Sequence, residues 1–164
     1  GHLHTILIRL DDLTFVKGDL YFEDDAQVEF GDYLREKEHK RDSYLYRIYK
    51  NQLKEESSEK LGKVECMLEY LDYPSLVASH IKPFINSSKD EAYDPDNGLL
   101  LSKNMDMLFD LGYISFEEDG KIILSEELSE DLQNYLKGYA LKSIFLNKKR
   151  LKYLKYHRKK VFRG

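Results

Sequence analysis

Three stretches decide the fold of this chain: SHIKP at residues 79–83, DNGLLL at 96–101 and MDMLFD at 105–110. The residues around His80 have the composition of a short strand, and the apolar run 99–101 has the length of a second, buried strand. The sequence therefore predicts two short paired strands, with His80 on or beside the hairpin that they form.

A helix is expected directly after the second strand. Ser102 is a residue type that caps helices, and the apolar residues after it recur at offsets of three and four. Asp106 and Asp110 then place their carboxylates on one helix face, one turn from each other. Two like charges so arranged cost a helix roughly 0.2–0.5 kcal/mol, which a divalent cation near them would remove.

These residue types suit metal-assisted hydrolysis of a phosphodiester bond. A histidine can activate water, and an asparagine follows it by 17 residues, with carboxylates 9 and 13 residues beyond the asparagine. Taken singly, His80 reads as a packed or surface histidine, Asn97-Gly98 as a turn, and the two aspartates as a solvated helix face. Their occurrence in order at these distances favours a catalytic site.

The order of strand, long loop, strand and helix resembles the HNH nucleases of the ββα-metal family, and most of all the HNH domains of bacterial restriction endonucleases. The resemblance covers about residues 64–128, and weakly the closing YLKYHRKKVF at 153–162. It implies an α+β fold in three parts. We expect an N-terminal strand, hairpin and helix region for recognition or dimerisation (1–60), an HNH core (61–131) and a basic helical tail (132–164).

The same resemblance implies roles for individual residues. His80 matches the general base, Asn97 matches the residue that holds the active-site loop, and Asp106 and Asp110 match two metal-ligand positions. Lys82 is a further candidate, as a contact to the substrate phosphate. The implied cofactor is one divalent ion per site, and the implied substrate is double-stranded DNA.

Three positions depart from the pattern of the family. Asp106 stands where a histidine is common, which favours Mg²⁺ or Mn²⁺ over softer metals. Ser79 stands where many relatives carry an acid or a second histidine, so a ligand is missing there or water replaces it. Cys66 is the single cysteine, which excludes the paired Cys-x-x-Cys motifs of a structural zinc site.

Charge is distributed unevenly along the chain. The first 131 residues contain all 30 acidic residues and carry a formal charge of −15, whereas residues 132–164 carry +11. A phosphate backbone attracts such a segment, in which tyrosines alternate with the basic residues. The expected nucleic-acid contacts in it are Lys148, Lys149, Arg150, Lys152, Lys155, Arg158 and Lys159.

Other interpretations of the basic segment stay open at this point. It suits a solvated cationic helix, an intramolecular partner for the acidic body, or a contact to RNA or protein. Its apolar face is modest, which makes binding to a membrane surface a poorer interpretation.

Composition limits the class of protein. A hydrophobic fraction of 41% fits a globular domain, and no apolar run approaches the length needed to cross a membrane. A lone cysteine argues against a disulfide framework, so we expect the reducing cytoplasm. The chain begins Gly1-His2 without Met, which indicates a trimmed chain or a piece of a longer protein.

Further elements are expected on both sides of the core. Alternating apolar residues predict a strand at 5–10, and Gly18-Asp19 predicts a hairpin turn. A second hairpin is expected over 114–124, around Asp119-Gly120, and a helix from about Glu126.

A long helix is expected over 33–60. Its apolar stripe at 44–53 favours core packing or a partner helix, and the polar run 55–59 predicts a joint or a frayed end. Double-strand cleavage by a nuclease with one site usually needs two copies, so a homodimer is a further expectation, with this stripe as a candidate surface.

The sequence thus favours a metal-dependent DNA endonuclease, a restriction endonuclease or its nuclease domain. The alternative is a nucleic-acid-binding or regulatory module that keeps the HNH fold without its chemistry. Ser79 favours that alternative, whereas His80, Asp106 and Asp110 argue against it.

Overall fold

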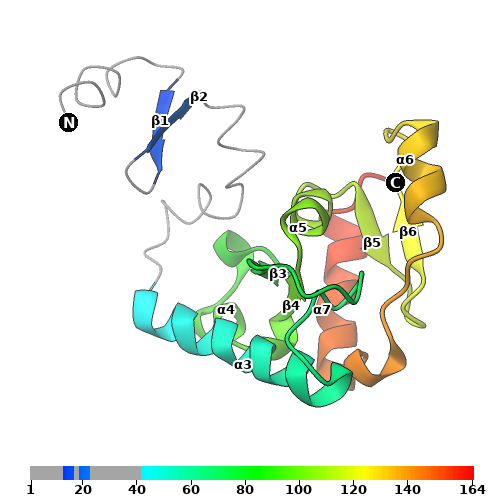
Figure 1. The fold of residues 1–164 in the computed structure, drawn as a ribbon. Helices are drawn as coiled ribbons and strands as arrows, with labels where there is room; N and C mark the ends of the chain where they lie inside the picture. The colour runs from blue at the N-terminus through cyan, green and yellow to red at the C-terminus, as the bar shows by residue number, and fades with distance from the viewer. Residues whose placement is uncertain (1–12, 17–18, 23–41) are drawn as a thin grey trace.

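The computed structural model describes residues 13–16, 19–22 and 42–164. The strand expected at 5–10 and the first part of the long helix, residues 33–41, lie outside the described residues. Strands β1 (Leu13–Val16) and β2 (Asp19–Phe22) pair antiparallel, with Val16 opposite Asp19 (Figure 1). Of the turn predicted at Gly18-Asp19, Gly18 lies outside the described residues and Asp19 is the first residue of β2.

Residues 42–164 contain two more antiparallel strand pairs and several helices. In chain order these elements are α3 (Ser43–Leu61), β3 (Val77–His80), η1 (Phe84–Asn86), α4 (Lys89–Ala92), η2 (Pro95–Asn97), β4 (Gly98–Leu101), α5 (Lys103–Asp110), β5 (Ile114–Phe116), β6 (Ile122–Leu124), α6 (Glu130–Leu136), η3 (Ser143–Phe145) and α7 (Lys148–Lys160). The α+β class is confirmed, and α6 begins later than the expected Glu126 because Ser129 caps it.

Helix α3 continues without interruption through 55–59, so the joint predicted there is wrong. The Asp42 side chain accepts hydrogen bonds at its start, and Gly62 ends it in the left-handed region with φ 90°. The polar run misleads because Ser57 is buried: its hydroxyl accepts from Glu65 N at 2.9 Å and donates to Glu65 O at 2.8 Å. These bonds tie α3 to the segment that enters the core.

The hairpin of β3 and β4 has the predicted strands. Val77 lies opposite Leu101 and His80 opposite Gly98, and all four residues of β4 are buried. Ser102 caps α5 by accepting a hydrogen bond from Met105 N at 3.3 Å. The connection between the strands is not an open loop, because η1, α4 and η2 occupy most of it.

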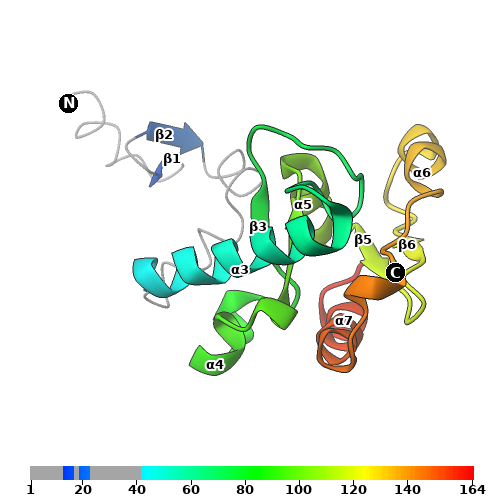
Figure 2. The same ribbon diagram turned by 60° about the horizontal axis from the view of Figure 1, so that its bottom comes forward.

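The β3–β4 hairpin lies between α3 and α5, as Figure 1 shows. Helix α7 runs alongside β5 and η2, so the C-terminal segment contacts both the β5–β6 pair and the connection between β3 and β4 (Figure 2). Four residues of α7 are buried, at positions that share one helix face: Arg150, Tyr153, Leu154 and His157. Helix α7 therefore belongs to the core and cannot be removed as a separate arm.

The apolar stripe predicted at 44–53 is mainly a core feature. Tyr49 and Leu53 are fully buried, whereas Tyr44 and Ile48 are 63% and 37% exposed. Tyr49 and Leu53 are thus unavailable as a dimer surface, whereas Tyr44 and Ile48 stay exposed. Within the described part of the chain, no helix combines the length and apolar character that a membrane span requires.

Candidate active site

His80 ends β3 and is held on three sides. Its Nε2 lies 2.8 Å from the carbonyl oxygen of Ala92, its ring stacks on that of Tyr49, and the edge of Phe84 lies against it. A carbonyl oxygen can only accept, so Nε2 must carry the hydrogen. The neutral ring then has its acceptor lone pair on Nδ1, which is the tautomer that a proton-accepting histidine needs.

Asn97 holds the connection between the two strands. Its Oδ1 accepts from the backbone N–H of Lys82 at 2.7 Å, and its Nδ2 donates to the carbonyl of Glu91 at 3.0 Å. The side chain is fully buried. Glu91 directly precedes Ala92, whose carbonyl orients His80. The hydrogen bond from Asn97 to the Glu91 carbonyl therefore helps to hold the Ala92 carbonyl in place.

Asp106 and Asp110 lie one turn apart on α5, with Asp106 half-buried and Asp110 8% exposed. Ser79 precedes His80 on β3, and alternation along a strand directs its side chain to the face away from α3. Its hydroxyl is the single buried side-chain polar atom without a hydrogen-bond partner in the part of the chain that the structure describes. Such an atom is costly to bury unless something binds it.

This donor set fits a hard divalent cation. Two carboxylates one turn apart and an unpartnered hydroxyl offer oxygen ligands alone, which Mg²⁺ and Mn²⁺ prefer. Among residues 42–164 and the described strands before them, no three His, Cys, Asp or Glu side chains gather as a ready-made metal cluster. Water ligands would therefore complete the coordination, as Mg²⁺ usually requires.

Lys82 lies two residues beyond His80, but its ammonium group has partners inside the protein. Nζ donates to both carboxylate oxygens of Glu91 at 3.0 Å and lies 5.1 Å from the centre of the Tyr156 ring. A phosphate contact by Lys82 would have to compete with Glu91. The contact to Tyr156 places α7 beside the start of the β3–β4 connection, two residues beyond His80.

Arg150 is a structural residue, contrary to the expectation that it contacts nucleic acid. It is fully buried, and its guanidinium donates to both carboxylate oxygens of Glu56 at 2.7 and 2.8 Å. It also donates to the carbonyls of Pro95, Gly98 and Phe145. The guanidinium of Arg150 is thus bound entirely within the protein. It joins α3 and α7 to the backbone on either side of Asn97.

The other basic candidates of α7 divide into two groups. Arg158 is half-buried and donates to the Phe116 carbonyl at 2.7 Å, and Lys149 pairs with Asp94 at 2.8 Å. Burial acts to raise the pKa of Asp94, but hydrogen bonds from Lys149 and Tyr153 outweigh it and hold the pKa below its usual value. The remaining candidates are exposed at offsets that share one helix face: Lys148, Lys152, Lys155 and Lys159. We call these four the lysine face.

Sequence reasoning missed the residues that hold this site from outside it. Tyr49 contacts His80, and Glu56 pairs with Arg150 across 94 residues of sequence. His157 stacks on Phe109 with ring centres 3.9 Å apart, and burial lowers its pKa to about 4. One signal in the sequence did indicate that α7 has a buried face. It was the helical spacing of Arg150, Tyr153, Leu154 and His157.

Residues 66–117 match the family model described as HNH endonuclease. This span contains β3, β4 and α5, and with them His80, Asn97 and both aspartates. The resemblance to HNH endonucleases is therefore confirmed over this segment of the chain. No curated protein matches the chain. The match suggests nuclease activity, which in the HNH family acts on DNA and typically uses a divalent metal, while α3 and α7 lie outside the matched span.

Proposed function

We propose that this protein is a metal-dependent DNA endonuclease of the HNH type, a restriction endonuclease or its nuclease domain. The observation that carries the proposal is the hydrogen bond from His80 Nε2 to the Ala92 carbonyl at 2.8 Å. It selects the tautomer in which Nδ1 accepts a proton, and general-base catalysis needs that acceptor.

In the proposed reaction, Nδ1 of His80 takes a proton from water, and the water oxygen attacks phosphorus opposite the leaving 3′ oxygen. Asn97 keeps the segment at Glu91 and Ala92 in place, so that the imidazole does not rotate as it gains the proton. Asp106 and Asp110 would hold the divalent ion, Mg²⁺ or Mn²⁺, with water at its remaining positions. When bound, that ion would stabilise the charge on a non-bridging oxygen and on the leaving group.

The lysine face is the proposed contact to the DNA backbone. Its side chains are exposed, and in the part of the chain that the structure describes none of the four forms an ion pair. Tyr156, one turn from both Lys152 and Lys159, lies against Lys82, two residues beyond His80. A duplex bound along this face would thus pass near the proposed base. Cleavage of both strands would require two copies of the protein.

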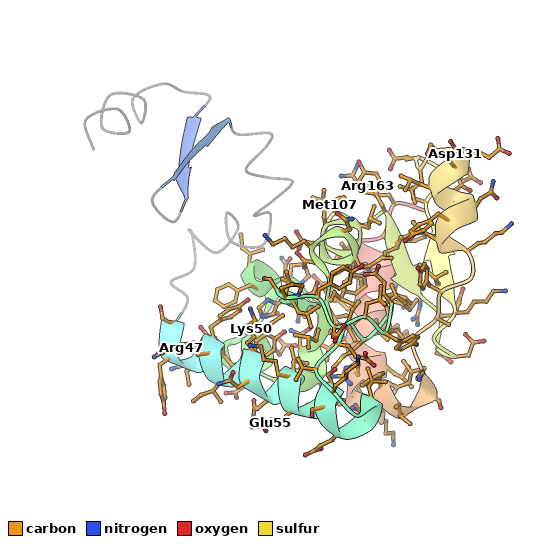
Figure 3. The ribbon with its side chains drawn as sticks, viewed as in Figure 1. Arg47, Lys50, Glu55, Met107, Asp131 and Arg163 are labelled. Carbon is orange, nitrogen blue, oxygen red and sulfur yellow. The ribbon has the colours of Figure 1, made fainter. Side chains whose placement is uncertain are left out.

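A plasmid-nicking assay tests the proposal. The protein should nick supercoiled plasmid in Mg²⁺ or Mn²⁺ and lose this activity in EDTA, since the site has oxygen ligands alone. Asp106→Asn and Asp110→Asn should weaken Mn²⁺ binding in calorimetric titration and lower the nicking rate, with the larger loss at Asp106. Asp131→Asn is the matched control, because Asp131 is exposed on α6 (Figure 3). Full activity in EDTA would refute the site assignment.

The alternative is a DNA-binding module of the same fold without catalysis. The observation that favours it is Ser79, a weaker ligand than a carboxylate or an imidazole. A protein that binds duplex DNA in a gel shift but never nicks it, at any Mg²⁺ or Mn²⁺ concentration, would support this alternative. A gel shift with RNA in parallel separates it from a module that binds RNA through α7.

A further inference from the structure

Tyr49 of α3 contacts His80, the proposed base, and Asn97, which holds the β3–β4 connection. Helix α3 itself lies outside the matched span 66–117. The side chain is fully buried, as is that of Leu53 one helical turn later. Helix α3 thus presents Tyr49 from its buried side to the β3–β4 hairpin.

The ring of Tyr49 covers one face of the His80 imidazole. The ring centres are 4.9 Å apart and the planes differ by 11°, which is a stacked arrangement. Phe84 meets the imidazole edge-on, with ring centres 5.8 Å apart and planes at 70°. Together with the Ala92 carbonyl, these contacts fix both the plane of the imidazole and its rotation within that plane.

The hydroxyl of Tyr49 acts on Asn97. It donates a hydrogen bond of 2.8 Å to the Asn97 carbonyl, inside the core. The same carbonyl accepts from Ile81 N at 3.4 Å, a long hydrogen bond just beyond the paired residues of the hairpin. Tyr49 therefore supplies the shorter of the two hydrogen bonds that the Asn97 carbonyl accepts, and this bond ties α3 to the residue just before β4.

Gly98 shows how closely Tyr49 approaches the hairpin. A Cβ at residue 98 would lie 2.2 Å from the Tyr49 hydroxyl oxygen and 2.9 Å from Leu53 Cδ1. The backbone of Gly98 is extended, with φ −160°, so space and not conformation requires glycine here. The absence of a side chain at Gly98 thus leaves the space that the Tyr49 side chain occupies.

We infer that Tyr49 is a positioning residue for the reaction: its ring orients His80 and its hydroxyl holds Asn97. This inference rests on the proposed function, in which His80 is the base. A general base must lie within hydrogen-bond reach of the proton that it takes, and a displacement of 1 Å costs on the order of 10²-fold in rate. Tyr49 acts through His80 and Asn97 without contacting the substrate.

Two substitutions separate the ring from the hydroxyl, and each has a matched control. Tyr49→Leu removes the stacked ring, and Phe145→Leu removes another fully buried aromatic ring. Tyr49→Phe removes only the hydroxyl, and Tyr70→Phe removes a hydroxyl that donates to the Ala140 carbonyl at 2.7 Å. Neither control side chain has a ring contact to His80.

Single-turnover cleavage of saturating plasmid in Mg²⁺ measures the effect, with the rate corrected for the folded fraction. Tyr49→Leu should lower the rate by about 10²-fold at unchanged affinity for DNA. Tyr49→Phe should lose less, because the stack remains, and both controls should keep the wild-type rate even where their melting temperatures fall. A wild-type rate for Tyr49→Leu would overturn the inference.

The proton NMR shifts of the His80 ring give a readout that does not depend on activity. Stacking on Tyr49 should shift these ring protons upfield, and Tyr49→Leu should abolish the shift while Tyr49→Phe preserves it. Unchanged shifts in Tyr49→Leu would also overturn the inference. If the wild-type protein never cleaves DNA, the proposed function fails, and these shifts still decide whether Tyr49 orients His80.

Discussion

Arg150 of α7 and Glu56 of α3 form a bidentate ion pair inside the protein, with N–O distances of 2.7 and 2.8 Å. Burial acts to raise the pKa of Glu56, but the hydrogen bond and the charge of Arg150 outweigh it and hold the pKa below its usual value. The pair joins two helices that both lie outside the HNH span. Arg150 also donates to the Pro95 and Gly98 carbonyls on either side of Asn97, so the pair connects both helices to the candidate site.

Removing one partner of this pair should destabilise the protein strongly. Glu56→Gln leaves a fully buried guanidinium without its counterion, which costs about 3–5 kcal/mol of unfolding free energy. The double variant Glu56→Leu with Arg150→Met should lose less than the sum of the losses of Glu56→Leu and Arg150→Met measured singly. Urea denaturation measures all of them. Lys63→Gln, which breaks an exposed pair with Asp72, is the control and should leave stability unchanged. Additive losses would contradict a direct interaction.

His157 should make the fold sensitive to mild acid. Burial lowers its pKa to about 4, while Nε2 donates to Phe109 O and Nδ1 accepts from Ser115. A depressed histidine pKa gives stability that is complete above the unfolded value of 6.5 and is lost as the pH falls toward 4. We expect a loss of about 2 kcal/mol between pH 8 and pH 5. The same series on His157→Gln should lack this slope, and an equal slope in both proteins would refute the assignment.

Gly98→Ala should be far more harmful than Gly138→Ala. A Cβ at residue 98 meets Tyr49 at 2.2 Å, whereas a Cβ at residue 138 meets nothing within 4 Å. Overpacking of this kind costs about 1–3 kcal/mol, and Tyr49→Phe should relieve part of it by removing the hydroxyl oxygen. Thermal melting of the single and double variants measures the effect. Equal losses at both glycines would show that Tyr49 does not crowd Gly98.

The residues of the candidate site could be proposed from sequence because they are close together in it. His80, Asn97, Asp106 and Asp110 lie within 31 residues, on elements whose periodicity and caps are local signals. The joint predicted at 55–59 was wrong because the bond from Ser57 to Glu65 is a tertiary contact that polarity alone conceals.

Arg150 could not be assigned from sequence for a related reason. A basic residue is usually exposed, and its counterion lies 94 positions away. Tyr49 was correctly read as part of an apolar stripe, but nothing local tells which ring it stacks on. The contacts that surround the site are long-range, and a single sequence shows no long-range pairing.

The lysine face should determine how DNA binding depends on salt. Lys152→Gln with Lys159→Gln removes two exposed charges, which should make the slope of log K against log salt less steep by about 1.8. The melting temperature should not change, since neither side chain is buried. Lys121→Gln with Lys137→Gln removes two exposed lysines elsewhere and should leave the slope as it was. Fluorescence anisotropy across a salt series measures both, and identical slopes would exclude the lysine face from the interface.

The role of His80 as the base is the central claim, and the single-turnover cleavage rate of His80→Ala tests it most directly. We expect His80→Ala to lose about 10²–10⁴-fold in rate, with duplex affinity and melting behaviour that still report a folded, DNA-binding protein. Added imidazole should restore part of the rate by entering the space beside Tyr49. Cleavage by His80→Ala at the wild-type rate would contradict the account.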